Sequence, residues 1–415
     1  MLNPSASEPR GEVLPADRPS APAAIRYPLA SIRYPFWALL KRDPKPARSR
    51  PRNAVIRARL RKMKHGARGL LWWLPFWYIV GQLVLLAWID DSWAFICTRV
   101  EHAKWKQFHA RLAEAPDRPL VLALGSSRTD WAFQAARLNG QRGPDGRPLL
   151  AYNFGVPSTG PMHQALYLND LLNEGIRPRL LLVEFVHTHF NKSQRELLSE
   201  EHFTTPQWLS AHQVLFLRPY YTNRRRLLLR WTESRLAPWY GFRYAIHEHL
   251  QGLHSRTNSY DQEEQPMDTL GSRMLYEDPN TPEFRDFRWA CSVNMYGDSL
   301  KHFRLGTAGP VQALRDLLAR CRREHIPVAL VRVPMGNNFR ALFPAKARAD
   351  LDNLFAELSK GVHAIDASHW LPTEDMDDGH HVLHTGATKY TTRMIEEVHK
   401  ILALTEPPAQ QQATP

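Results

Sequence analysis

Three residues have the types and the spacing needed for acyl transfer through a serine. Ser127 follows the aliphatic run LVLAL, which breaks at Gly125 into two small hydroxyl residues. A sharp turn from a strand into a helix holds a serine oxygen clear of the backbone, where it can act as a nucleophile. Near the carboxyl end, Asp378 and His381 are spaced so that the carboxylate can orient the imidazole that removes the serine proton. The pattern predicts a Ser-His-Asp triad.

The Asp-x-x-His pair has alternatives within the same region. Its spacing recurs in two other pairs, Asp377 with His380 and Asp366 with His369. Asp366 closes an expected strand, where a polar residue is common for structural reasons, and His380 lacks the apolar residue that follows His381. We therefore take Asp378 and His381 as the orienting carboxylate and the base.

Short aliphatic runs alternate with helical patterns after residue 119. The runs are 120–124, 149–154, 180–186, 328–333 and 362–366. Amphipathic segments at 129–139 and 162–173 each end next to a glycine, as helices commonly do, and a third begins at Ala387. This alternation predicts an α/β fold in which helices cover both faces of a parallel sheet.

The connection between the third and fourth expected strands is roughly 125 residues, too long for a compact sheet. We assign 187–310 to a helical insertion, the kind of segment that often carries substrate contacts. Its arginines could grip an anionic polymer or lipid headgroups, or they could form a solvated helix face: Arg224, Arg225, Arg226, Arg230, Arg235 and Arg243. The sequence does not choose between these uses.

The net charge of +13 is concentrated at the amino end of the chain. Residues 1–89 contain sixteen of the 54 Lys and Arg but four of the 41 Asp and Glu, which leaves 38 against 37 in the rest. The main domain therefore lacks the net basic surface that nucleic-acid binding requires, and we expect no nucleic-acid partner. The three cysteines have no metal-ligand spacing, and we expect no cofactor.

Residues 69–89 carry no charge and are long enough to cross a bilayer as a helix. Twelve Lys and Arg precede this segment between residues 41 and 68, and two Asp follow it. The positive-inside rule then predicts a cytoplasmic amino terminus and an extracytoplasmic main domain. The expected parts are a disordered basic cytoplasmic tail (1–68), a transmembrane helix (69–89), the main domain (90–405) and a disordered end (406–415).

At these motifs the chain resembles the SGNH hydrolases, also called GDSL-like. In that family the nucleophile follows the first strand in a Gly-x-Ser turn, and an Asp-x-x-His segment with a glycine five residues after the histidine closes the domain. The matching residues here are Gly125, Ser126, Ser127, Asp378, His381, Val382 and Gly386. The resemblance extends over 119–405, apart from the insertion, and implies a three-layer, flavodoxin-like domain that hydrolyses or transfers esters.

The literal letters GDSL occur elsewhere, at 297–300. No aliphatic strand precedes them, and only 79 residues separate Ser299 from Asp378, too few for the remaining strands. We therefore prefer Ser127 as the nucleophile.

The resemblance also implies an oxyanion hole, formed by a backbone N–H after the second strand and an Asn side chain after the third. The first position falls on Ser158, with Gly160 nearby. The third strand lacks the family's Gly-x-Asn-Asp, so Asn191 is either the donor or a helix cap. His187 and His189 could suggest a metal, but we interpret them as hydrogen-bonded loop residues and expect no metal.

The whole plan is most similar to membrane-anchored envelope proteins, such as the D-alanyl transfer protein of teichoic acid operons and polysaccharide O-acetylation proteins. This similarity implies the inner (plasma) membrane of a bacterium, a glycan or polysaccharide substrate, and a multi-pass membrane O-acyltransferase as partner. Our hypothesis is a serine esterase or O-acyltransferase. Because Ser126 replaces the family's usual Asp and the Asn motif is missing, the alternative is a catalytically degenerate binding or scaffold protein.

Overall fold

The computed structural model describes residues 52–91, 99–192, 199–244, 246–247, 267–274, 281–306 and 309–405. The chain divides into two compact units, 1–72 and 73–415, and every described strand belongs to the second. The expected disordered end at 406–415 and most of the expected tail at 1–68 lie outside the described residues.

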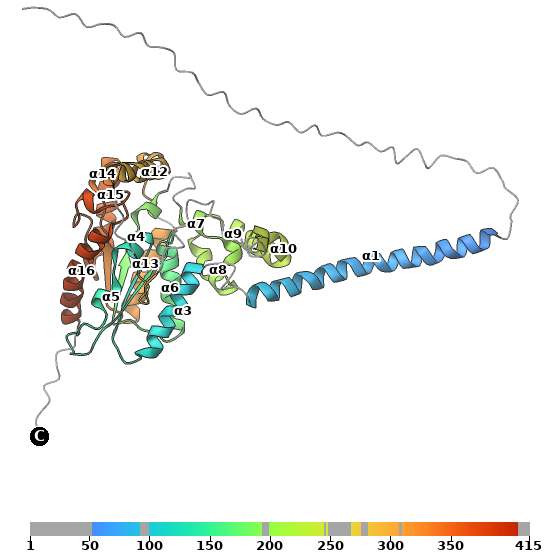
Figure 1. The fold of residues 1–415 in the computed structure, drawn as a ribbon, viewed down its shortest axis with the longest axis horizontal. Coiled ribbons are helices and arrows are strands. Elements are labelled where there is room, and N and C mark those ends of the chain that lie inside the picture. The colour runs from blue at the N-terminus through green and yellow to red at the C-terminus, as the bar shows by residue number, and fades with distance from the viewer. Residues whose placement is uncertain are drawn as a thin grey trace, which may run out of the picture. The chain divides into compact units, whose positions relative to one another are not determined.

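A parallel five-stranded sheet lies at the centre of the second unit (Figure 1). In the order β2-β1-β3-β4-β5, its strands are β2 (Leu150–Gly155), β1 (Leu120–Gly125), β3 (Leu180–Glu184), β4 (Val328–Arg332) and β5 (His363–Asp366). Because β1 pairs with β2 on one side and β3 on the other, the loops after these strands meet at one edge of the sheet. The predicted α/β fold with a parallel sheet is confirmed, including all five strands.

Helices lie on both sides of the sheet (Figure 1). They include α3 (Arg99–Glu114), α4 (Ser127–Ala132), α5 (Ala135–Leu138), α6 (Pro161–Asn173), α13 (Pro310–Arg323), α14 (Asn337–Arg340), α15 (Ala345–Leu358) and α16 (His384–Leu404). Helix α6 packs against α13, and α16 packs against α4 and α5. In α13, Leu314, Leu318 and Cys321 recur at helical spacing on the buried face, as expected for a helix that covers a sheet.

The expected single helix over 129–139 is two short helices, α4 and α5. The carboxamide of Asn153, within β2, donates to the carbonyl oxygens of Thr129, Asp130 and Phe133 at 3.0, 3.3 and 2.7 Å. The Asn153 side chain thus occupies carbonyl oxygens that would otherwise accept N–H groups of the next helical turn. The helix ends there, and Phe133 is extended. The sequence pattern could not show this contact.

The described chain between β3 and β4 is helical, as expected for the insertion at 187–310. Its elements are η1 (His187–Phe190), α7 (Glu200–Phe203), η3 (Pro206–Trp208), α8 (Ala211–Leu217), η4 (Arg218–Tyr220), α9 (Arg224–Leu236), α10 (Pro238–Gly241) and α12 (Pro282–Lys301). A further short turn, η6 (Thr373–Asp375), precedes the candidate histidines. The limits of the insertion as a separate part stay a prediction.

The apolar segment near the amino end is part of a longer helix, α1 (Arg52–Asp91). Residues 52–68, which we expected in the disordered tail, are helical, and their many Ala, Arg, Leu and Lys residues favour this conformation. The window Trp72–Ile89 has a mean hydropathy of 1.5, and only 6% of it is buried. Within the described residues this is the one helix long and apolar enough to cross a membrane.

We expect Gly125→Ala to destabilise the domain. A Cβ at this position, the end of β1, would overlap the Thr129 hydroxyl and lie 2.6 Å from Glu184 Oε2. The free energy of unfolding, measured by urea titration, should fall by about 1–3 kcal/mol. Gly297→Ala is the matched control, because its Cβ would meet Val293 at an ordinary 3.4 Å. Equal stability of the two variants would contradict the close approach at Gly125.

Candidate active site

The three residues of the predicted triad are in hydrogen-bonding contact. Ser127 Oγ lies 2.8 Å from His381 Nε2, and His381 Nδ1 lies 2.8 Å from Asp378 Oδ2. With Asp378 ionised, these contacts fit one tautomer, in which Nδ1–H donates to the carboxylate and Nε2 accepts the serine hydroxyl. Trp131 stacks on the His381 ring at a centroid distance of 4.8 Å and limits its rotation. This geometry allows His381 to receive the Ser127 proton.

A buried carboxylate holds the turn that presents Ser127. Glu184, the last residue of β3, accepts the Ser126 N–H at 2.7 Å, the Ser126 hydroxyl at 3.0 Å and the Thr129 hydroxyl at 2.7 Å. The Ser126 hydroxyl also caps α4 by accepting the Arg128 N–H. Ser127 is therefore the first helical residue, and its own N–H has no acceptor inside the helix.

Sequence reasoning missed the role of Glu184. A signal was present, because Glu184 ends an otherwise aliphatic strand, LLLVE, at the edge of the sheet where sites usually form. The chain has Ser126 where the SGNH motif has an Asp, and Glu184 brings a carboxylate to the same turn from the neighbouring strand.

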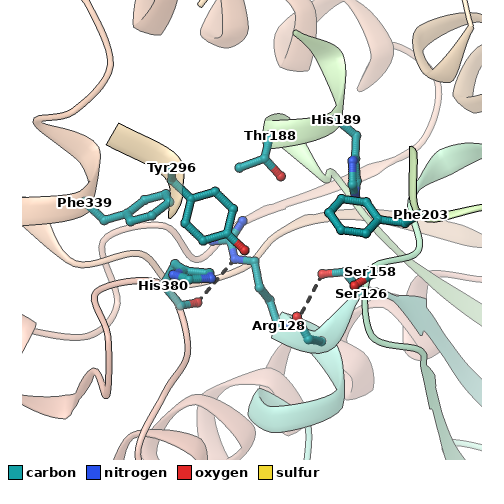
Figure 2. Close-up of a pocket in the computed structure, with 10 residues that line it drawn as sticks. Ser126, Arg128, Ser158, Thr188, His189, Phe203, Tyr296, Phe339 and His380 are labelled. Carbon is teal, nitrogen blue, oxygen red and sulfur yellow. Dashed lines mark hydrogen bonds between the residues drawn. The ribbon is translucent and has the colours of Figure 1, made fainter. Parts of the chain in front are cut away.

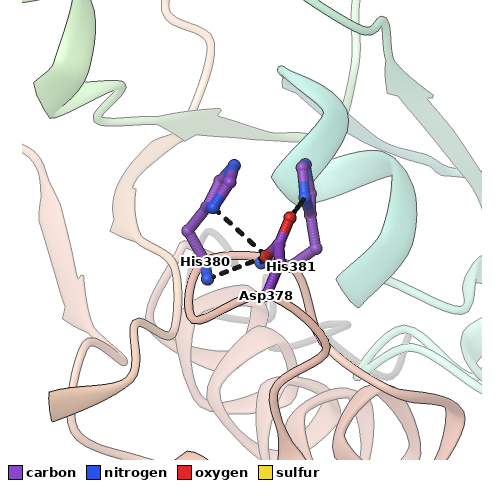
Figure 3. A group of neighbouring side chains, drawn as sticks. All are labelled: Asp378, His380 and His381. Carbon is purple, nitrogen blue, oxygen red and sulfur yellow. Dashed lines mark hydrogen bonds and ion pairs between the residues drawn. The ribbon is translucent and has the colours of Figure 1, made fainter. Parts of the chain in front are cut away.

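Asp378 is a buried carboxylate shared by two histidines (Figure 3). It accepts the backbone N–H groups of His380 and His381 at 3.1 and 2.8 Å, and its oxygens also contact the Nδ1 atoms of both rings. Burial alone would raise the pKa of Asp378, but the two imidazoles and their hydrogen bonds outweigh it and hold the pKa well below its usual range. Asp378 is therefore ionised at neutral pH.

His380 is the second histidine on Asp378, and its ring lies beside that of His381 at a centroid distance of 4.1 Å. Phe339 stacks on its ring at 4.7 Å and Tyr296 meets it edge-on at 4.8 Å. Burial lowers the pKa of His380 to about 4, against the attraction of Asp378. A neutral His380 leaves the charge of Asp378 directed mainly at His381.

Among the described residues, the cluster that could hold a metal ion is Asp378 with His380 and His381, whose ligand atoms lie within 4.8 Å of one another. Both Nδ1 atoms already point at the Asp378 carboxylate, and His381 Nε2 already meets Ser127. Binding a metal would break the triad contacts, so this donor set fits proton transfer better than metal ligation.

A buried arginine, Arg128, follows the candidate nucleophile. Its guanidinium donates to the carbonyl oxygens of Pro334 and His380 and to His187 Nδ1 at 2.9 Å, and it lies 4.0 Å from Glu184. Burial lowers the pKa of Arg128 against the attraction of Glu184, yet an arginine remains charged at neutral pH. Burial and this cation together lower the pKa of His187 well below its usual value, so His187 is neutral and its Nδ1 accepts the Arg128 N–H.

A pocket opens next to Ser127 (Figure 2). In Figure 2, His189 and Phe203 stand on one side of it, and Tyr296 and Phe339 stand on the other. The insertion supplies His189, Phe203 and Tyr296, so it forms much of the wall that a substrate would meet. That the insertion carries substrate contacts stays a prediction.

The three oxyanion candidates differ in their surroundings. Ser158 lines the pocket and has a φ of 62°, a left-handed conformation that residues other than glycine seldom adopt. The predicted role of Gly160 in an oxyanion hole is corrected, because its N–H donates to the buried Glu200 carboxylate at 2.9 Å. The predicted role of Asn191 is corrected as well. Its side chain donates to the Ser299 carbonyl and accepts the Arg304 N–H, so it joins the loop after β3 to the end of α12.

Thr188 was missed, although it follows the third strand where the family has its Asn donor. It lies on η1 and lines the pocket with Ser127 and Ser158. Figure 2 shows its side chain directed into the pocket. The missing Gly-x-Asn-Asp pattern gave no sequence signal that a hydroxyl would lie there.

The rejected alternatives have other surroundings. Ser299 is buried within α12, so its GDSL letters do not form a turn after a strand. Asp377 pairs with Arg288 at 2.6 Å, and Asp366 pairs with Arg332 at 3.2 Å. Of the three Asp-x-x-His pairs, the structure brings Asp378 and His381 to Ser127.

No protein-family model and no curated protein matches the chain. Among solved structures, the chain is similar to the crystal structure of a "putative acylhydrolase" from Bacteroides fragilis. The TM-score is 0.32 at 11% identity, covering 71% of this chain and 96% of that one. A TM-score this low says nothing about activity. The argument for an activity therefore rests on the geometry of the site.

The stability of the protein should depend on pH through His380. An unfolded histidine binds a proton below about pH 6.5, whereas folded His380 stays neutral down to about pH 4. Between these values the unfolded state holds more protons, so stability is full above pH 6.5 and is lost as the pH falls toward 4. We expect His380 to contribute roughly 3 kcal/mol of this loss.

Urea unfolding of wild type and His380→Asn across this pH range measures that contribution. The variant should lose less stability than wild type between pH 6.5 and pH 4, because Asn binds no proton. Parallel curves for the two proteins would show that His380 is protonated in the folded state.

Proposed function

We propose that the protein is a serine esterase or O-acyltransferase that acts through an acyl-enzyme on Ser127. The observation that carries this proposal is the continuous hydrogen-bonded path from Ser127 Oγ through His381 to the buried, ionised Asp378. A serine hydroxyl is a weak nucleophile until a positioned base removes its proton, and this path provides that base.

In the first half-reaction, Ser127 Oγ attacks the ester carbonyl carbon while His381 Nε2 takes the hydroxyl proton. Asp378 stabilises the imidazolium that results. Collapse of the tetrahedral intermediate breaks the bond to the alcohol, which leaves with the proton from His381. In the second half-reaction, water or a sugar hydroxyl gives its proton to His381 and attacks the acyl carbon; the bond to Ser127 Oγ then breaks, and His381 returns the proton to that oxygen. Water gives hydrolysis, and a sugar hydroxyl gives transfer.

The developing oxyanion would be stabilised by the Ser127 and Ser158 backbone N–H groups and by the Thr188 hydroxyl. Ser158 and Thr188 support this assignment because both line the pocket beside Ser127. The Arg128 cation, buried directly behind the turn, adds a positive potential where negative charge develops.

The proposed setting is the outer side of a bacterial inner membrane, with α1 as a single anchor and an envelope glycan as substrate. The apolar window Trp72–Ile89 supports the anchor. The resemblance to envelope glycopolymer proteins supports the glycan and a multi-pass membrane O-acyltransferase as the source or recipient of acyl groups. A wall built largely by the insertion suits a bulky substrate better than a closed cleft would.

A serine-directed fluorophosphonate should label wild-type protein and fail to label Ser127→Ala. The reagent forms a stable bond only with a serine whose proton is removed by a neighbouring base. In-gel fluorescence of the labelled protein gives the result, with folding of each variant checked by circular dichroism.

Ser299→Ala is the matched control and should label as wild type does, because this serine is buried in α12. Equal labelling of folded Ser127→Ala and wild type would remove Ser127 as the nucleophile. No labelling of wild type at all would favour the alternative of a degenerate scaffold.

Thr188→Val should lower kcat by about 10²–10³ with little change in KM, because valine keeps the shape and removes the donor. Thr188→Ser keeps a hydroxyl and should retain most of the activity. Steady-state hydrolysis of a p-nitrophenyl ester measures both variants. An unchanged kcat for Thr188→Val would exclude this hydroxyl from the oxyanion hole.

A further inference from the structure

We propose that a surface of the insertion lies in the lipid bilayer beside α1. The surface comprises Leu236, Trp239, Tyr240, Arg243 and Tyr244, and we call it the aromatic ridge. The inference rests on the proposed membrane anchoring by α1 and adds a second membrane contact, made by the domain itself. It holds whichever side of the membrane the domain occupies.

A hydrogen bond places the aromatic ridge at the depth of the apolar window. The Trp239 backbone N–H donates to Gln82 Oε1 at 3.1 Å. Gln82 lies seven residues before Ile89, the end of the window, which corresponds to about 10 Å along the helix axis. If α1 spans a bilayer, Trp239 therefore lies below the level at which α1 leaves the apolar layer.

The bond from the Trp239 N–H also gives a reason for a polar side chain, Gln82, in the middle of an apolar segment. Gln82 is the one amide side chain in the window Trp72–Ile89. Backbone N–H groups within an apolar layer need an acceptor from protein, since water is absent there. Gln82 supplies the acceptor for Trp239, and the N–H groups of Tyr240 and Phe242 bond to carbonyls within the same turn.

A small apolar cluster fixes the flank of α10 on α1. Ile89 and Phe242 are buried together with Ile246, and Leu85 and Trp88 pack against them. The ridge residues are not part of this cluster: Leu236, Trp239, Tyr240 and Tyr244 are 75%, 57%, 59% and 71% exposed. The helix that would be surrounded by lipid thus adjoins a group of exposed large apolar side chains.

The composition of the aromatic ridge suits the outer part of the apolar layer, from which its polar groups can reach the headgroups. Trp and Tyr are enriched at this depth because their rings are apolar and their N–H or O–H groups reach water. Arg243 lies over both Tyr240 and Tyr244, with its guanidinium 4.2 and 4.4 Å from the ring centroids. Exposed Arg224, Arg225 and Arg230 on α9 would add attraction to anionic lipid headgroups.

Hydrogen bonds connect the part of the insertion that carries the aromatic ridge to the wall of the pocket. Trp231 of α9 donates through Nε1 to the Leu209 carbonyl at 2.9 Å. Just before α9, the Thr222 N–H donates to Glu201 at 2.6 Å. Glu201 belongs to α7, the helix that ends at the pocket residue Phe203. The bilayer would therefore hold the insertion, and with it one wall of the pocket, at a set height above the membrane.

The test uses the full chain in vesicles of phosphatidylcholine and phosphatidylglycerol, with the three native cysteines replaced. An environment-sensitive nitrobenzoxadiazole fluorophore is attached at Trp239→Cys, at Leu83→Cys on α1, or at Leu404→Cys. Leu404 is the matched control, since it is 75% exposed at the end of α16. Quenching is measured with doxyl-labelled lipid and with aqueous iodide.

We expect the fluorophores at positions 239 and 83 to lose emission to doxyl lipid and to resist iodide, and the fluorophore at 404 to do the reverse. Quenching of position 239 by iodide as at 404, with position 83 still quenched by lipid, would overturn the ridge inference and leave the anchor intact. Iodide quenching at position 83 would overturn the anchor and the ridge together.

Discussion

The contact on which the site depends is the buried Glu184 carboxylate beneath the turn at Gly125–Ser127. It accepts the Ser126 N–H and two hydroxyl groups, and the absent side chain of Gly125 leaves it room to approach. Without this carboxylate, the buried Ser126 N–H would lack its acceptor, and the buried Arg128 cation 4.0 Å away would lose its nearest negative charge. Removing one member of such a buried pair commonly costs about 3–5 kcal/mol, so the turn and the charge behind it are fixed together.

Arg128 extends this constraint from the nucleophile to the base. Its guanidinium reaches the Pro334 carbonyl after β4 and the His380 carbonyl in the carboxyl-terminal loop. The serine turn and the histidine loop are far apart in the sequence but share one buried cation. Hydrogen bonds of this one guanidinium therefore hold the serine turn and the histidine loop together at the edge of the sheet.

The sequence was informative where a signal is local and uninformative where a contact comes from elsewhere. Aliphatic runs located each of the five described strands, and residue type with chain order located Ser127, Asp378 and His381. Two of the three oxyanion candidates could not be judged from the sequence, because the Gly160 N–H donates to Glu200 and the Asn191 side chain to the Ser299 carbonyl, both from the insertion. The same limit applies to the break between α4 and α5, which depends on Asn153 from another strand.

A second buried group of charges holds the opposite side of α4. Asp130 pairs with Lys104 of α3 and with Arg273 of the insertion, and Lys104 also donates to the Gly271 carbonyl at 2.7 Å. A helix of six residues is not stable alone, because it has too few internal hydrogen bonds to offset its ordering. Glu184 and Arg128 on one side and this group on the other supply what α4 lacks. The helix that begins at Ser127 is consequently held rigidly before any substrate binds, which is the condition under which a fixed oxyanion hole lowers a reaction barrier.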